Sequence, residues 1–185
     1  MMTTEAPLIT PNLVRQIGRD LLHAAAGFGG KDGIDVWQTA GAVTQIAPEA
    51  PQWQVIAVAA ALVRILAGRT SFEDATDDEV QAAQFLREAR SSVGCGQFER
   101  TITFEQARVM TAILGMAEVA TPGGDNSSVV DAAVAWEQRF TILDCWQVTY
   151  LAVQLIRTIA DFSGDPLRLL SVLIDELRHQ KDEDQ

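Results

Sequence analysis

Apolar residues recur at steps of three and four along most of the chain, the spacing that places them on one face of an α-helix. The first such segment begins at Thr10-Pro11, an N-cap followed by proline at the first helical position, and Gly27 closes it. A glycine-rich connector then leads to a shorter helix, expected from about Asp35 to Ala47 because Pro48 stops it. These signals predict two helices in the first quarter of the chain.

The third predicted helix differs from the first two in its apolar pattern. It runs from Pro51 to Ala67 and is expected to end at Gly68. Apolar residues occupy almost its whole circumference, which is typical of a helix covered on every side by neighbours. We therefore expect this helix at the centre of the fold.

Capping signals mark the next helices. Thr76 and Thr103 are each followed three positions later by Glu or Gln, the capping-box pattern that satisfies the first backbone amides of a helix. Helices are therefore expected over 76–91 and 103–120. Asp165-Pro166 gives a similar start signal for a last helix.

The segment from Ser128 to Phe162 contains neither glycine nor proline. It forms either one helix of roughly 50 Å or two helices joined end to end. Thr141 and Asp144 fit a second capping pattern, which favours a break near Phe140. Helix Thr141–Phe162 would then share the core with the third helix.

The predicted helices cover roughly two-thirds of the chain, about twice the usual share. No segment offers a partner for a strand, so the class is all-α, without a sheet. We expect a single compact bundle of seven or eight helices over 11–180. A flexible N-terminus at 1–10 and a polar tail at 181–185 are expected to flank it.

Composition narrows the range of functions. Acids outnumber bases 25 to 14 among 185 residues, for a net charge of -11, which makes nucleic-acid binding a poor expectation. The longest apolar segment, Val55 to Leu66, is shorter than the roughly 20 residues of a membrane span. The two cysteines match no metal-ligand spacing, so neither metal nor cofactor is expected, and whether Cys95 is reactive stays open.

The same composition suggests where the protein works. No secretory signal is visible at the start of the sequence, which predicts a cytoplasmic location. Only two of the 14 basic residues are lysine, and alanine is abundant, as in proteins of GC-rich bacterial genomes.

The strongest local chemical feature is a run of acids: Glu73, Asp74, Asp77, Asp78 and Glu79. Acids at the start of a helix stabilise it through the helix dipole, and this is the favoured interpretation. The run could also attract a basic partner. Trp136 is a second candidate for a partner-binding residue, since tryptophan often anchors interfaces.

A different set of polar residues interrupts the apolar helix near the end of the chain: Asp144, Gln147, Gln154 and Arg157. They would supply the polar lining of a ligand pocket between helices. The alternative is that they form a narrow solvent-facing stripe.

Two hypotheses of function follow. The first is a non-catalytic helical module for protein–protein interaction, an adaptor, regulatory or assembly component whose partner is another protein or a second copy. Its motivation is that no catalytic motif is evident, so the protein is not expected to be an enzyme. The second is an all-α ligand-binding protein or enzyme with a pocket between helices, possibly cation-dependent. Binding of a metal or metabolite that raises the melting temperature would favour the second.

Overall fold

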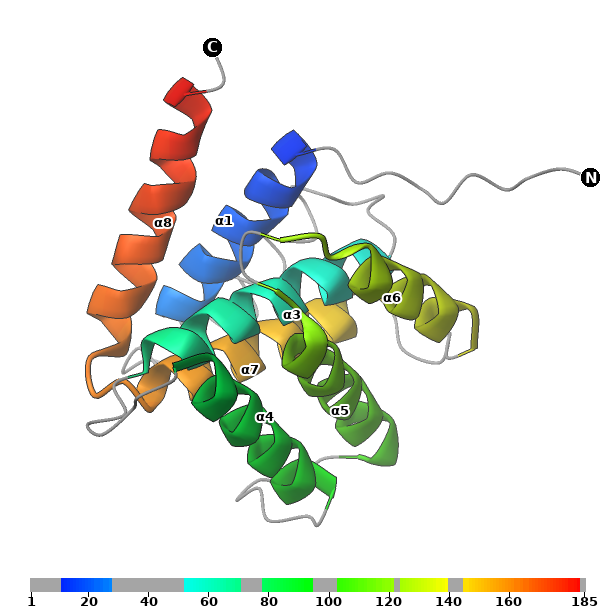
Figure 1. Cartoon of the computed structure of the whole chain (residues 1–185). Helices are drawn as coiled ribbons and strands as arrows, with labels where there is room; N and C mark the ends of the chain where they lie inside the picture. The colour runs from blue at the N-terminus through cyan, green and yellow to red at the C-terminus, as the bar shows by residue number, and fades with distance from the viewer. Residues whose placement is uncertain are drawn as a thin grey trace, which may run out of the picture.

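The computed structural model describes residues 11–27, 52–70, 78–94, 103–121, 124–139 and 145–183, and these residues contain seven helices and no strand. The helices are α1 (Pro11–Gly27), α3 (Gln52–Arg69), α4 (Asp78–Gly94), α5 (Phe104–Val119), α6 (Ser127–Arg139), α7 (Cys145–Asp161) and α8 (Pro166–Glu183) (Figure 1). The all-α prediction is confirmed. The helix expected over 35–47 and the N-terminal segment 1–10 lie outside the described residues.

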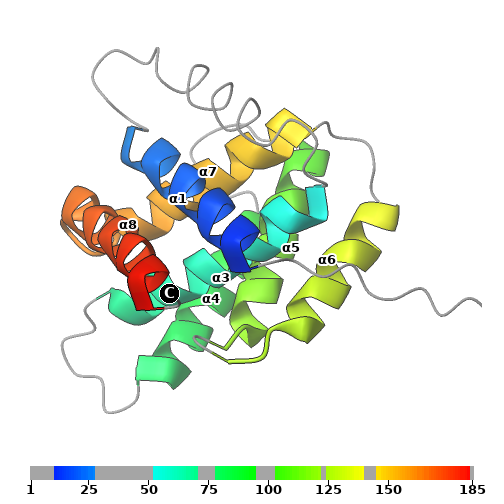
Figure 2. The ribbon, with the colours of Figure 1, turned by 90° about the horizontal axis from the view of Figure 1, so that it is seen from above.

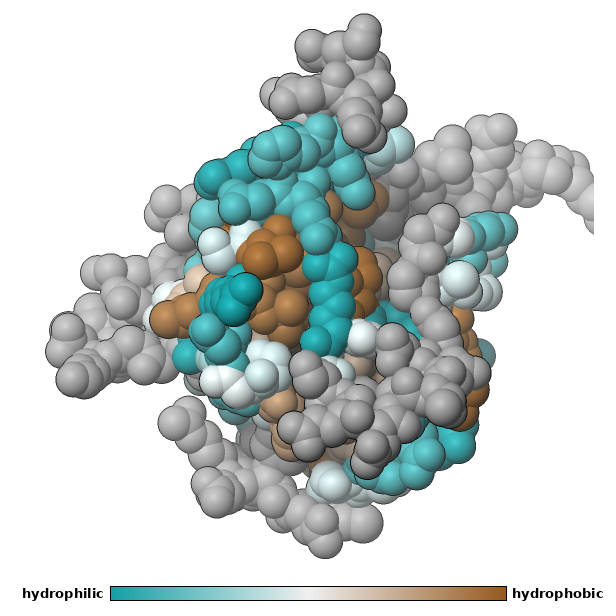
Figure 3. Space-filling view, turned by 60° about the vertical axis from the view of Figure 1, so that its left-hand side comes forward, coloured by the Kyte–Doolittle hydropathy of each residue, from teal (hydrophilic) through white to brown (hydrophobic). Residues whose placement is uncertain are grey.

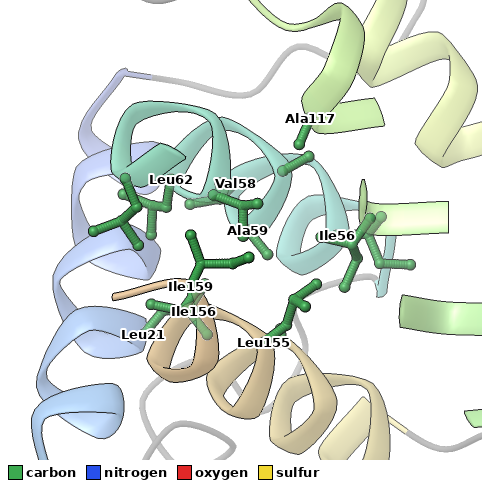
Figure 4. Close-up of a cluster of buried hydrophobic side chains, with 14 of the residues drawn as sticks. Leu21, Ile56, Val58, Ala59, Leu62, Ala117, Leu155, Ile156 and Ile159 are labelled. Atoms are coloured by element: carbon green, nitrogen blue, oxygen red, sulfur yellow. The ribbon is translucent and has the colours of Figure 1, made fainter. Parts of the chain in front are cut away.

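Helix α3 is the centre of the bundle, as its apolar circumference predicts. It packs against α1, α4, α5, α6 and α7. Ile56, Val58 and Ala59 of α3 lie over Leu155 and Ile159 of α7, and all five are buried (Figure 4). These two helices form the middle of the hydrophobic core.

The end of α3 differs from the expected stop at Gly68. The helix continues to Arg69, and the Thr70 amide still donates to the Leu66 carbonyl at 3.0 Å, in the i to i−4 pattern of the helix. The buried Thr70 hydroxyl donates to the Ala67 carbonyl at 2.7 Å, so this side chain satisfies one of the last carbonyls and the helix runs through the glycine.

The segment 128–162 forms two helices. Helix α6 ends at Arg139 and α7 begins at Cys145, which agrees with the predicted break near Phe140. The two helices lie in different parts of the molecule, α7 beneath α3 and α6 at the edge of the bundle (Figure 1). The Thr141–Asp144 cap itself lies outside the described residues.

Two helix starts have the predicted chemistry. Thr103 and Gln106 form a complete capping box, with the Gln106 amide 3.2 Å from the Thr103 hydroxyl and the Thr103 amide 3.0 Å from Gln106 Oε1. Asp165 accepts from the Arg168 amide at 3.2 Å at the start of α8. Two helices run past their expected ends, α4 to Gly94 and α8 to Glu183, so part of the expected polar tail is helical.

Helix α8 lies along the outside of α1 (Figure 2). Gly18 permits this close packing, since a Cβ atom there would lie 3.3 Å from Leu177 Cδ1 of α8. Arg69 at the end of α3 reaches α8 through two hydrogen bonds to Glu176, at 2.8 and 2.7 Å. This ion pair joins the end of the central helix to the outermost one.

The side that carries α8 exposes a mixture of residue types, with hydrophobic residues near its middle and hydrophilic residues around them (Figure 3). Large hydrophobic side chains that remain exposed include Leu167 and Val172 of α8, and Phe104 and Val119 of α5. No helix among the described residues is long and apolar enough to cross a membrane.

Candidate docking groove between α4, α5 and α6

An open cavity of about 660 Å³ lies between α4, α5 and α6. Most of its lining side chains are apolar or small, and the charged residues among its described lining are all arginines. Helix α5 forms the floor of this groove, while α4 and α6 form its two walls.

The floor is a single stripe along α5, at the three- and four-residue steps of one helix face. It consists of Phe104, Ala107, Arg108, Thr111, Ala112, Gly115, Met116 and Val119. The opposite face of α5 carries fully buried side chains, such as Ile113 and Leu114, that belong to the core. From its first to its last residue the floor extends roughly 22 Å along the helix axis. Its middle includes the small residues Ala112 and Gly115.

Helix α6 presents its own stripe to the groove, formed by Ala132, Ala135, Trp136 and Arg139. Its buried face is small, with only Val129 and Ala133 buried among its residues. The two alanines of the stripe are exposed, although they face an apolar floor. This wall therefore has an apolar face that no described part of the chain covers.

Two polar contacts hold the α6 wall in place. At its start, Asn126 donates to the Thr121 carbonyl at 3.1 Å and accepts from the Thr121 amide at 2.9 Å, which ties the start of α6 to the end of α5. Near its end, Glu137 Oε1 accepts from the backbone amide of Trp53, 3.4 Å away in the first turn of α3. The width of the groove therefore depends on the central helix.

The α4 wall supplies Arg90, which lies beside Gly115 of the floor. A Cβ atom at Gly115 would come within 3.2 Å of Arg90 Nη1, so the glycine makes room for this guanidinium. Arg90 pairs with Glu118 at 3.2 Å, and Arg87 pairs with the other oxygen of the same carboxylate at 3.0 Å. These ion pairs hold α4 against α5.

Arg108 lies on the floor of the groove, with its guanidinium over the Phe104 ring, 5.1 Å from the ring centroid. Such a cation–π contact holds the charge and the exposed ring together at the entrance to the floor.

Of the predicted partner-binding residues, Trp136 lines the groove. Glu73, Asp74 and Asp77 lie outside the described residues. Asp78 and Glu79 form the first turn of α4, and the structure does not describe their side chains. The acidic patch therefore stays a prediction from sequence.

The predicted pocket residues lie elsewhere. Gln147, Gln154 and Arg157 are half-buried on α7, and none of them lines the groove. Arg157 donates to the carbonyls of Ala25 and Ala26 at 3.2 and 3.4 Å, at the end of α1. Its Nε also donates to Asp161 at 2.9 Å. This guanidinium thus has a structural role, since it satisfies the last carbonyls of α1. Asp144 lies outside the described residues.

The described residues contain no group of three or more His, Cys, Asp or Glu that could hold a metal ion. Burial raises the pKa of Asp20 on α1, while Arg19 and His23 partly offset that effect. Asp20 does not line the groove. The groove therefore offers apolar contact and positive charge.

The sequence analysis missed the floor of the groove. The sequence signal of the floor is a second stripe of residues on α5, a helix that already has a core face. This second stripe contains several small residues and has Phe104 and Val119 at its ends. Such a stripe is easily assigned to the core, because apolar residues on both faces are also typical of a fully buried helix.

Comparisons with known protein families, with characterised proteins and with solved structures found no match to this chain. The inference of function therefore rests on the groove.

Proposed function

We propose that the protein is a non-catalytic helical module for protein–protein interaction, which binds a helical segment of its partner in the groove between α4, α5 and α6. The observation that carries this proposal is the uncovered stripe of α5. Phe104 and Val119 at its two ends are 70% and 65% exposed, although both are large and apolar. A bound helix would remove both from water.

The shape of the groove favours a helix as its occupant. Amphipathic helices bind grooves through residues at i, i+3, i+4 and i+7, and both the floor and the α6 wall repeat at these steps. A floor of about 22 Å matches a helix of about 15 residues, or four turns. Trp136 would provide an aromatic anchor beside the small residues of the floor.

We place this interaction in the cytoplasm, with another protein or a second copy of the chain as the partner. The net charge of -11 still argues against nucleic acid. The acidic run at 73–79 remains a separate candidate surface for a basic partner. Charge reversal of Asp77, Asp78 and Glu79 that left every interaction intact would eliminate it.

The test is selection of 15-residue helical peptides from a display library, using the purified protein as bait. Selected peptides should bind the wild-type protein and lose binding to Ala132→Arg, which introduces a long side chain into the groove. Ser171→Arg makes the same kind of change at an exposed site on α8 and should leave binding unchanged. Circular dichroism would verify that both variants fold. Peptides that bind Ala132→Arg as well as the wild type would contradict the proposal.

The second candidate is a small-molecule site in the same cavity, because about 660 Å³ is within the range of ligand pockets. A metabolite that raised the melting temperature of the wild type and not of Ala132→Arg, in the absence of any peptide binding, would favour this alternative.

A further inference from the structure

The charge of the groove is opposite to the charge of the protein. Acids outnumber bases 25 to 14 in the whole chain, but the charged residues that line the groove in the described part of the chain are Arg90, Arg108 and Arg139. Each comes from a different helix, so positive charge is present on both walls and on the floor. The groove is therefore a local basic site on an acidic protein.

Among the described residues, the ion pairs on the α4 wall leave positive charge in excess. Glu118 is the carboxylate next to Arg90, and it also pairs with Arg87, so two guanidinium groups share one acid. Glu118 is only 14% exposed, whereas the Arg90 side chain is 40% exposed. A bound partner can therefore reach the arginine while the glutamate stays covered.

We propose that the groove selects an amphipathic helix that carries Asp or Glu on both sides of its apolar stripe. This inference rests on the proposed function and specifies the chemistry of the partner. Guanidinium groups form short, paired hydrogen bonds with carboxylates, so a helix with acidic flanks gains charge-assisted contacts at the rim. A helix with lysine flanks meets like charges at the same positions.

The negative charge of the remaining protein does not prevent this selection. Interactions between exposed charges are largely screened beyond about 8 Å at physiological salt. The arginines line the groove itself, so they lie within this distance of a bound segment. Strong dependence of the association rate on salt is the expected sign of such contacts.

The test uses a library of 15-residue helical peptides with a fixed apolar stripe, in which each flanking position is Glu, Gln or Lys. Selection on the wild-type protein should enrich Glu. Labelled Glu-rich and Lys-rich peptides, measured by fluorescence anisotropy, should differ in affinity by at least about tenfold. The difference should shrink as salt is raised.

The matched variants are two double charge reversals. Arg108→Glu with Arg139→Glu should abolish or invert the preference for Glu, whereas Arg168→Glu with Arg178→Glu on α8 should leave it unchanged. Arg139→Glu alone should weaken it, which keeps the test valid if the double variant folds poorly.

The outcomes separate this inference from the proposed function. Enrichment of Gln or Lys, in peptides that Ala132→Arg no longer binds, overturns the acidic preference and leaves the groove as a docking site. Failure to enrich any peptide overturns both. Binding of a fatty acid or of anionic vesicles through the same arginines, without competition from Glu-rich peptides, would assign the groove to lipid and overturn the inference.

Discussion

Helices α3 and α5 have similar apolar sequences and opposite environments. Both carry apolar residues on more than one face, and both have core residues that are fully buried. Five helices surround α3, whereas the outer face of α5 forms the floor of an open groove. An apolar circumference therefore has two explanations, a central position or a second surface for binding. Residue size does not separate them, because α3 itself contains five alanines, whereas the position of the helix among its neighbours does.

The largest expected effect concerns burial in these two helices. Ile56→Ala in α3 removes a fully buried side chain next to α7, and we expect it to cost about 2–5 kcal/mol of unfolding free energy. Val119→Ala at the exposed end of α5 should change stability by less than about 0.5 kcal/mol. Urea denaturation of both variants checks the difference. Equal losses would mean that the outer face of α5 is covered.

A second, smaller effect on stability is expected from two arginines, Arg157 on α7 and Arg139 on α6. Arg157→Ala removes hydrogen bonds to the last carbonyls of α1, and we expect a loss of about 1–3 kcal/mol. Arg139→Ala at the rim of the groove should cost less than about 0.5 kcal/mol. The measurement is thermal unfolding by circular dichroism. A larger loss of stability in Arg139→Ala would show that this arginine stabilises the fold, which would contradict its assignment to partner binding.

A third effect concerns the start of α5. The first turn of α5 begins at the exposed Phe104, so we expect this turn to depend on its own capping box. Thr103→Ala should therefore destabilise the protein by about 1 kcal/mol, and Thr103→Ser should retain most of the stability. Hydrogen exchange should show the loss at the first amides of α5. Unchanged exchange there would indicate that other contacts hold this turn.

The smallest effect concerns the ion pair between Arg69 at the end of α3 and Glu176 of α8. The hydrogen bonds from Arg69 lower the pKa of Glu176, so the pair stabilises the folded state above the ordinary glutamate pKa, and this contribution disappears as pH falls below it. Because both side chains are more than a third exposed, Glu176→Gln should cost less than about 1 kcal/mol at neutral pH. The wild type and the variant should converge in acid and at high salt. A persistent difference would contradict the ion-pair explanation.

The sequence predicts the helices well, because their signals are local. The caps at Thr103 and Asp165 and the pattern of α3 require no knowledge of other segments. The separation of α6 from α7 agrees with a local capping signal as well. Boundaries fail where an unexpected side chain satisfies one of the last carbonyls, as Thr70 does at the end of α3.

The candidate site is harder to predict, because it depends on how helices are placed. Polar residues on α7 suggest a pocket, but the Arg157 guanidinium contacts carbonyls more than 130 positions away. Trp136 is a candidate from the sequence, and only the structure shows that it lines the groove beside α5. The groove forms where α4, α5 and α6 meet, so the residue pattern of any one of these helices does not predict it.

The contact between Glu137 and Trp53 has a consequence for how the groove can be observed. The amide proton of Trp53 lies at the start of the central helix, and its acceptor lies 84 positions later, on α6, which forms one wall of the groove. An occupant that pushes this helix outward lengthens the bond and accelerates isotope exchange at Trp53. An occupant that fits between the walls without displacing them slows the same exchange. The rate of isotope exchange at the Trp53 amide would thus distinguish the two ways in which a partner can occupy the groove.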